Sequence, residues 1–337
     1  MSIPTPGSQE WLDQVTEPII EPDRRIIDPH HHLWDRHDIG SYLLENLWAD
    51  TDSGHHIEKT VFVECGASYR PDGPEHLMPI GETEFVARIA ADSAAGAPGQ
   101  ARIAAIVARA DLRLGAQLID VLDAHEHAGG GLFRGIRHAG ARDSNREVLM
   151  GRAFAPEGLY ADPEFRAGVQ TLGTRGMSYD TWHYHHQNPD FAELARACPG
   201  TTIILDHFGT PLGVGPYADR RAEIFAAWKQ DIAAIAELPN VIAKLGGLAM
   251  HINGFGWHAR ERPATSDEFV EAQRPYYEHT IECFGPQRCM FESNFPVDRM
   301  SLSYPVLWNA LKKIAAGYSE DEQDAMFYRT AARVYRI

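Results

Sequence analysis

The stretch Arg25-Ile-Ile-Asp-Pro-His-His-His-Leu-Trp34 decides how the rest of the chain is interpreted. With the two-residue period of a β-strand, Asp28, His30 and His32 share one face and His31 lies on the other. Two imidazoles on one side of a rigid strand, preceded by a carboxylate, can bind a divalent metal. The alternative is a histidine-rich loop or a set of hydrogen-bonded core histidines, since short histidine-rich tracts also bind metal adventitiously.

Length and composition indicate a globular protein with a substantial core. The chain has 337 residues, of which 44% are hydrophobic and 23% charged, and single α/β barrels commonly reach this length. The formal net charge of −16 disfavours nucleic acid and anionic membranes as partners, because their phosphates would be repelled. No run of Lys or Arg offsets this charge.

The amino-terminal residues 1–23 contain four prolines and several acids, which predicts an irregular arm before the first strand. They lack the pattern of a secretory signal, and no segment is long and apolar enough to span a membrane. The four cysteines are widely spaced without a CxxC pair, which is typical of reduced thiols. These features together predict a cytoplasmic protein.

Strand-like and helix-like segments alternate along the chain. Eight β-branched or apolar runs are predicted as strands, at 25–34, 58–66, 102–111, 132–138, 176–183, 201–207, 240–246 and 288–294. Helical periodicity falls between them, at 80–95, 116–127, 163–172, 189–197, 222–238 and 265–284, and Thr265 with Glu268 and Ser319 with Glu322 fit capping boxes. This count predicts a (β/α)8 TIM barrel forming a single domain over residues 1–337, with long loops after strands 1, 4 and 7. A doubly wound open sheet is the alternative, but the Gly-rich phosphate turn it would need is absent.

Polar side chains recur at the predicted strand ends, where a barrel of this kind carries its reactive groups. These residues are His30, His32, Arg137, His138, Asp180, His183, Asp206, His207, Glu292, Asn294 and Asp298. Because Asp206 and His207 are adjacent, we expect them to point to opposite faces of their strand. Several of these groups can bind a metal, so the ends of the strands are the predicted site.

Several motifs, spread over nearly the whole chain, resemble those of the amidohydrolase superfamily. The motifs are Ile27-Asp-Pro-His-His-His-Leu-Trp34, Gly135-Ile-Arg-His138, Leu205-Asp-His-Phe-Gly-Thr-Pro211, Ser293-Asn-Phe-Pro-Val297 and Ala331-Ala-Arg-Val-Tyr335. The resemblance is to the amidohydrolase-2 branch, which includes lactonases of dicarboxylate lactones and sugar lactones. It implies that His30, His32 and His207 line a metal or substrate site, with His183 as a further candidate.

The chain departs from the family pattern at the end of the eighth strand. The family has an Asp there as metal ligand and general base, whereas this sequence has Asn294. An amide takes no proton at neutral pH and is a poorer metal ligand than a carboxylate. The base would then be Glu292, two residues earlier, or Asp298 just beyond, and Glu292 is the first choice.

Hydrolysis of a lactone or another ester-like carbonyl is the predicted reaction. A divalent metal, with zinc as first choice, bound by His30, His32 and His207 would lower the pKa of a bound water. Without metal, the same imidazoles could stabilise the oxyanion as hydrogen-bond donors. Arg137 would bind a substrate carboxylate with two parallel hydrogen bonds, or would form a salt bridge at its strand end.

Other residues could complete a pocket for a small, negatively charged substrate. His138, His183, Trp34 and Trp257 are the candidate substrate-binding residues, although aromatic side chains in long loops more often anchor the loop. Two arginines of the loop after the fourth strand, Arg142 and Arg152, could attract an anion or lie on the surface.

Two other functions compete with the hydrolase hypothesis. One is decarboxylation or hydration of an aromatic or unsaturated acid on the same fold. The other is a binding protein or pseudoenzyme whose chemistry was lost with the change to Asn294. Many such barrels also self-associate, so a homo-oligomer is a further expectation.

Overall fold

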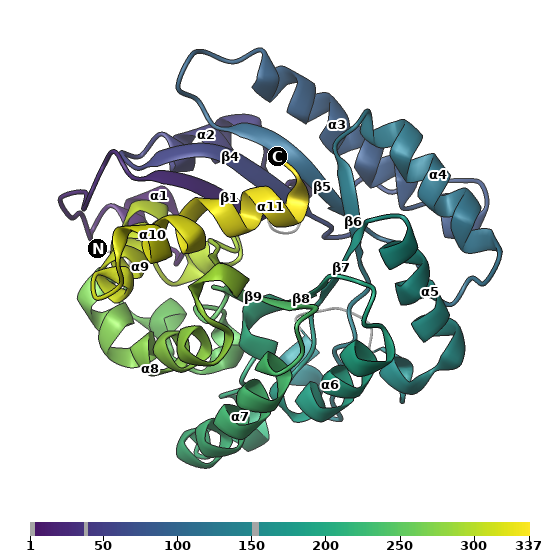
Figure 1. Cartoon of the computed structure of the whole chain (residues 1–337). Helices are drawn as coiled ribbons and strands as arrows, with labels where there is room; N and C mark the ends of the chain where they lie inside the picture. Colours follow the sequence, from purple (N-terminus) through teal and green to yellow (C-terminus); the bar gives the residue numbers. More distant parts are fainter. Residues whose placement is uncertain (1–3, 37–39, 150–154) are drawn as a thin grey trace.

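The strand-like segments form one parallel sheet in the computed structural model, which describes residues 4–36, 40–149 and 155–337. Neighbouring strands pair in the order β1-β4-β5-β6-β7-β8-β9-β10. Their bounds are Arg25–His31, His56–Val63, Arg102–Ala108, Phe133–Arg137, Ser178–Thr181, Ile203–Leu205, Val241–Leu245 and Cys289–Phe291. The strands surround a common centre and the helices lie outside them (Figure 1). The predicted (β/α)8 barrel and its single domain are confirmed.

The strands are shorter at their carboxyl ends than the sequence predicts. β8 ends at Leu205 and β10 at Phe291, whereas the predicted segments continue to His207 and Asn294. Both of these residues have positive φ, 53° and 55°, so the chain leaves the extended conformation there.

The barrel closes between β1 and β10 through a short seam. The backbone N–H of Asn294 donates to the carbonyl of His30 at 3.0 Å, and the N–H of His32 donates to the carbonyl of Phe295 at 2.8 Å. One step lower, the N–H and hydroxyl of Ser293 donate to the Asp28 carboxylate at 3.0 and 2.6 Å. A side chain therefore replaces a backbone acceptor at the seam.

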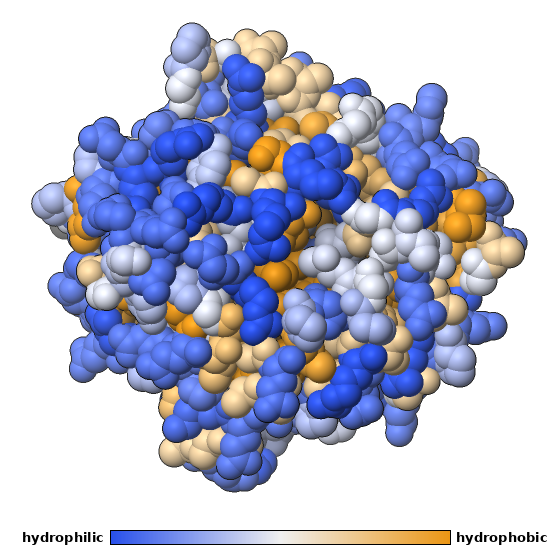
Figure 2. Space-filling view, viewed as in Figure 1, coloured by the Kyte–Doolittle hydropathy of each residue, from blue (hydrophilic) through white to orange (hydrophobic). Residues whose placement is uncertain are grey.

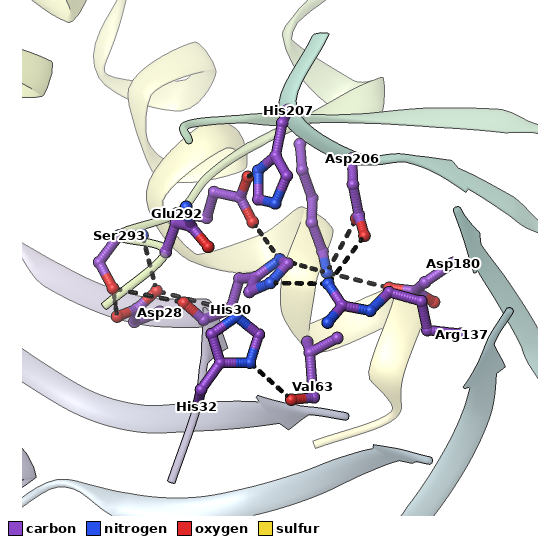
Figure 3. A network of polar contacts seen from close by, with 12 residues as sticks. Asp28, His30, His32, Val63, Arg137, Asp180, Asp206, His207, Glu292 and Ser293 are labelled. Carbon is purple, nitrogen blue, oxygen red and sulfur yellow. Dashed lines mark hydrogen bonds and ion pairs between the residues drawn. The ribbon is translucent and has the colours of Figure 1, made fainter. Parts of the chain in front are cut away.

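The predicted sharing of one face by Asp28, His30 and His32 is wrong for Asp28. Its carboxylate accepts a hydrogen bond from the hydroxyl of Tyr304 at 2.9 Å, at the start of the outer helix α9 (Tyr304–Ala315), while His30 points into the barrel (Figure 3). The pairing of β1 with β4 shifts between Asp28 and His31. This irregularity reverses the alternation of side chains part of the way along β1.

The helices cover the outside of the barrel and match the predicted periodicity. Their bounds are α3 Ile80–Ala94, α4 Gln117–Gly129, α5 Pro163–Thr174, α6 Asn188–Ala197, α7 Arg221–Ala236, α8 Ser266–Phe284, α9 Tyr304–Ala315, α10 Glu320–Asp324 and α11 Thr330–Tyr335. Both predicted capping boxes are present, at the starts of α8 and α10.

Two segments predicted as irregular contain regular structure. The loop after β1 includes the short hairpin of β2 (Trp34–Arg36) and β3 (Gly40–Tyr42), followed by helix α2 (Leu44–Thr51). The amino-terminal arm contains helix α1 (Gln9–Leu12), whose Trp11 side chain is fully buried. Both helices are short and depend on tertiary packing, so local periodicity did not reveal them.

The amino-terminal end of the barrel is filled by apolar side chains. The cluster comprises Ile27, Val61, Val63, Ala105, Val107, Ile204, Ile242 and Met290 from the strands, with Ala331 and Tyr335 from α11. α11 crosses this end in Figure 1, and Figure 2 shows mostly hydrophilic side chains on the same face. The polar interior must therefore be reached from the carboxyl ends of the strands. No helix among the described residues is long and apolar enough to cross a membrane.

Candidate active site

Charged and imidazole side chains converge inside the barrel at the carboxyl ends of the strands (Figure 3). The group consists of His30, Glu64, Arg137, Asp180, Asp206, His207, Lys244 and Glu292, all buried. They come from seven strands or the residues just after them, because alternate positions of each strand point inward. The sequence predicted this convergence for His30, Arg137, His207 and Glu292.

The carboxylate of Glu292 lies between two imidazoles. Oε2 is 2.7 Å from Nδ1 of His30, and Oε1 is 2.7 Å from Nδ1 of His207. The two ring centroids are 4.6 Å apart, and one donor atom from each of the three residues lies within 4.8 Å of the others. Two nitrogens and one carboxylate are a donor set that suits zinc.

Arg137 is held inside this network. Its Nε donates to Oε1 of Glu64 at 2.9 Å, and Nη2 donates to the Glu64 carbonyl. Nη1 lies 3.3 Å from Nε2 of His30 and 3.8 Å from Oδ2 of Asp206. Because a guanidinium only donates, Nε2 of His30 faces a donor, and its Nδ1 lies toward Glu292, with the Lys244 ammonium 3.4 Å from it.

Lys244 supplies the second cation. Its ammonium group lies 2.9 Å from Oδ2 of Asp180 and 3.3 Å from Oδ1 of Asp206. The hydroxyl of Tyr335, at the filled end of the barrel, donates to the same oxygen of Asp180 at 2.7 Å. Although burial opposes it, these carboxylates raise the pKa of Lys244, so the lysine stays charged.

The network holds more acids than bases. Glu64, Asp180, Asp206 and Glu292 face only two permanent cations, so full ionisation leaves two negative charges uncompensated in a buried site. Burial raises the pKa of Glu292 to about 8 and that of Asp206 to about 6, while burial lowers the pKa of His207 to about 3. The excess would be balanced by bound protons or by a divalent cation, since isolated buried charges are costly.

Asp206 and His207 both face this network, so their predicted placement on opposite faces is wrong (Figure 3). β8 ends before them, and His207 and Phe208 both have positive φ, 53° and 59°. The backbone turn brings two successive side chains to the same side, which the alternation of an extended strand cannot do.

The predicted metal ligand His32 lies beside the cluster. Its ring centroid is 5.0 Å from that of His30, and its Nδ1 donates to the carbonyl of Val63 at 2.8 Å. The ring of Trp34 stacks on the His32 ring, with the two ring centroids 6.2 Å apart. The structure thus groups His30 and His207 with Glu292 more closely than with His32.

Asn294 and Asp298 form a pair of their own. Nδ2 of Asn294 donates to Oδ1 of Asp298 at 2.9 Å, and the N–H of Ala249 lies 3.3 Å from Oδ2. Burial raises the pKa of Asp298 well above its ordinary value. The catalytic roles of both residues stay predictions.

Three predicted substrate-binding residues pack among core side chains. Nδ1 of His138 accepts from the N–H of Leu112 at 3.2 Å. Nε2 of His183 donates to Oδ1 of Asn188 at 3.0 Å. Trp257 is 2% exposed and stacks between two phenylalanines. These surroundings fit structural roles, and their part in binding stays a prediction.

Two arginines of the loop after β6 were predicted to attract an anion or to lie on the surface, and the structure describes one of them. Arg142 is bonded to the carbonyl of Ala155 at 3.1 Å and lies 3.4 Å from Glu157. Arg152 lies outside the described residues.

Sequence reasoning did not select Lys244 or Glu64 as site residues. Lys244 is the charged residue in the otherwise apolar strand Val-Ile-Ala-Lys-Leu at 241–245, and a charge in such a run was a usable signal. Glu64 directly follows β4. Glu64 pairs with Arg137 on β6, and β5 lies between their two strands. The spacing of the two residues in the sequence could not predict this pairing.

Several known proteins are similar to this chain. A protein of Sinorhizobium fredii named y4mH is 34% identical, over 94% of this chain and 99% of that protein. An L-fucono-1,5-lactonase of Burkholderia multivorans is 28% identical, over 76% of this chain and 77% of its own length.

Solved structures resemble the barrel over most of its length. A crystal structure of a Burkholderia multivorans amidohydrolase with bound zinc has a TM-score of 0.72 and 25% identity, covering 93% of this chain and 99% of that one. The family model described as "Amidohydrolase" matches residues 27–337, which include every residue of the buried network and all of the barrel strands except the first two residues of β1. The chain therefore belongs to the amidohydrolase family.

Proposed function

We propose that this protein hydrolyses the lactone ring of a small carboxylated substrate, with Glu292, His30 and His207 at the reacting centre. The observation that carries the proposal is the Glu292 carboxylate lying 2.7 Å from Nδ1 of both histidines. The named activity of the Burkholderia relative, a sugar-lactone lactonase, supports the reaction class.

Water adds to the lactone carbonyl carbon in this reaction, and the bond from that carbon to the ring oxygen breaks. The ring oxygen takes up one proton of the water and leaves as a hydroxyl group, and the other proton is released as the carbonyl becomes a carboxylate. Glu292, whose pKa burial raises to about 8, accepts the proton of the attacking water, since a base with a pKa near the working pH is most effective. Arg137 lies against Nε2 of His30, so Nδ1 is the ring nitrogen that faces Glu292.

A divalent metal fits the same residues. His30, His207 and Glu292 would hold it, and its two charges would balance the two excess carboxylates of the network. When bound, such an ion lowers the pKa of water and polarises the carbonyl oxygen. Zinc is the first choice because the donor set combines nitrogen with one carboxylate.

The test combines metal analysis with turnover. We expect the purified protein to contain about one zinc or similar ion per chain and to release acid from at least one lactone of a panel that includes 5-oxotetrahydrofuran-2-carboxylate, D-glucono-1,5-lactone and L-fucono-1,5-lactone. Glu292→Gln should lower kcat by about 100-fold or more, because it removes both the proton acceptor and a ligand. The matched control Glu278→Gln, which changes a surface carboxylate beside Arg274, should leave the rate unchanged.

The competing functions give different results. Release of carbon dioxide from an aromatic carboxylic acid, with no acid release from any lactone, would favour a decarboxylase. Absence of turnover in protein loaded with metal would favour a binding protein. Light scattering in solution would test whether the barrels self-associate, as many of this fold do.

A further inference from the structure

The buried network leaves Arg137 poorly placed to bind a substrate carboxylate. Its guanidinium already donates to the side chain and carbonyl of Glu64 and faces His30, and the residue is 2% exposed. A carboxylate could reach two of its N–H groups only by displacing Glu64. If the substrate is anionic, another cation near the mouth must bind it.

Arg109 is such a cation. Val107 on β5 is paired with Gly135 on the neighbouring strand β6. Arg109 follows Val107 by two residues, and Arg137 follows Gly135 by two residues. The two arginines therefore lie level with each other. Arg109 is half-buried, and its Nη1 donates to the carbonyl of Ala110 at 2.7 Å. No carboxylate oxygen of residues 4–36, 40–149 or 155–337 forms an ion pair with its guanidinium.

Arg109 lines a cavity of about 530 Å³ at the carboxyl ends of β4 and β5. The other walls include Tyr69, Met78 and Asp111. Asp111 is neutralised by Arg113, which binds it at 3.0 and 2.7 Å. Glu75 is an exposed carboxylate at the edge of the cavity. Of the described residues that line the cavity, which also include His76, Arg109 is the permanent cation available to a ligand.

The cavity lies at the same end of the barrel as the reacting centre. β4 and β5 lie between β1, which carries His30, and β6, which carries Arg137. Burial raises the pKa of the Tyr69 hydroxyl in the cavity wall, and the negative charge of Glu64 raises it further. The same carboxylate binds Arg137 beside His30, so Glu64 acts on a residue of the cavity wall and on a residue of the reacting centre.

We propose that this cavity holds the part of the substrate remote from the lactone carbonyl, and that Arg109 binds a free carboxylate there. This inference rests on the lactone hydrolysis proposed above and adds the residue that binds the carboxylate of the substrate. A guanidinium suits the task because its planar set of donors matches a carboxylate.

The test compares two lactones that differ only in charge: 5-oxotetrahydrofuran-2-carboxylate and its 2-carboxamide. We expect Arg109→Ala to lower kcat/KM for the acid by about 10- to 100-fold, mainly through KM, and to change the amide by less than about threefold. Arg109→Lys should restore part of the activity on the acid. Glu75→Gln should lower KM for the acid alone, because it removes a repelling charge from the cavity edge.

Arg196→Ala is the matched control, since it removes an arginine charge on helix α6, paired with Glu193, without touching the cavity. Equal losses on both lactones in Arg109→Ala, or no loss on either, would overturn the inference. Binding of 2-hydroxyglutarate by calorimetry gives a measurement independent of turnover. If the wild type opens neither lactone, the proposed function fails; the inference survives only if wild-type binding of 2-hydroxyglutarate is lost in Arg109→Ala.

Discussion

Lys244 shows how a single residue can determine the electrostatics of a buried site. It is fully buried, and its ammonium group lies within 3.3 Å of two carboxylates from neighbouring strands. In a barrel interior, removing one member of such a set leaves the others charged and desolvated. The lysine therefore stabilises the fold by balancing acids that the site requires.

Replacing this lysine should be costly. We expect Lys244→Met to lower the free energy of unfolding by about 3–5 kcal/mol, because Asp180 and Asp206 lose their cation. The double variant Lys244→Met with Asp180→Asn should recover part of the loss. Denaturant unfolding measures both, with exposed Lys229→Met as the control. A loss below about 1 kcal/mol in Lys244→Met would show that the two acids do not depend on the lysine.

At the scale of elements, the junction of β1 and β10 depends on one side chain. Asp28 accepts hydrogen bonds from the N–H and hydroxyl of Ser293 and from the hydroxyl of Tyr304. It thus joins the first strand, the last strand and helix α9. Since His30 and Glu292 lie on the same two chain segments, this junction also sets the distance between them.

Disruption of the junction should loosen the end of the barrel. We expect Asp28→Ala to lower the free energy of unfolding by about 3 kcal/mol or more, because four buried donors, including the backbone N–H of His30, lose their acceptor. Hydrogen exchange should accelerate first at the amides of Ser293 and Asn294. Asp28→Asn retains one acceptor oxygen and should cost less. Exchange that remains slow at these amides in Asp28→Ala would contradict the assigned role.

For the whole molecule, a buried acid outside the site makes stability depend on pH. Glu82 at the start of α3 accepts from the N–H groups of Cys65 and Ala67, at 3.1 and 2.7 Å. Burial, and then the charge of Glu64, raise its pKa from 4.5 to about 7. The folded state therefore binds this proton more tightly than the unfolded chain does.

The sign of the pH effect follows from this difference. The contribution of Glu82 is fully present below pH 4.5 and is lost as the pH rises through 7, because the unfolded chain gives up the proton first. We expect the stability of the wild type relative to Glu82→Gln to fall by up to about 3 kcal/mol between pH 4.5 and pH 8. Urea unfolding at several pH values measures it, and parallel curves for the two proteins would contradict the shift.

The sequence by itself determined the order of strands and helices and the positions where polar residues end the strands. His30, His207 and Glu292 were identified because apolar runs end at or near them, and a barrel brings such ends together. Local periodicity is sufficient for this, since it depends on neighbours along the chain. Helix α2 and the hairpin before it were missed because packing, more than periodicity, stabilises them.

Only the tertiary structure decided which partners these side chains have. Arg137 binds Glu64 and Lys244 binds Asp180 because the register of four separate strands sets their heights inside the barrel. Asp206 and His207 share a side because of positive φ after β8. Register and backbone turns of this kind depend on the closed sheet as a whole, so no local pattern in the sequence could predict them.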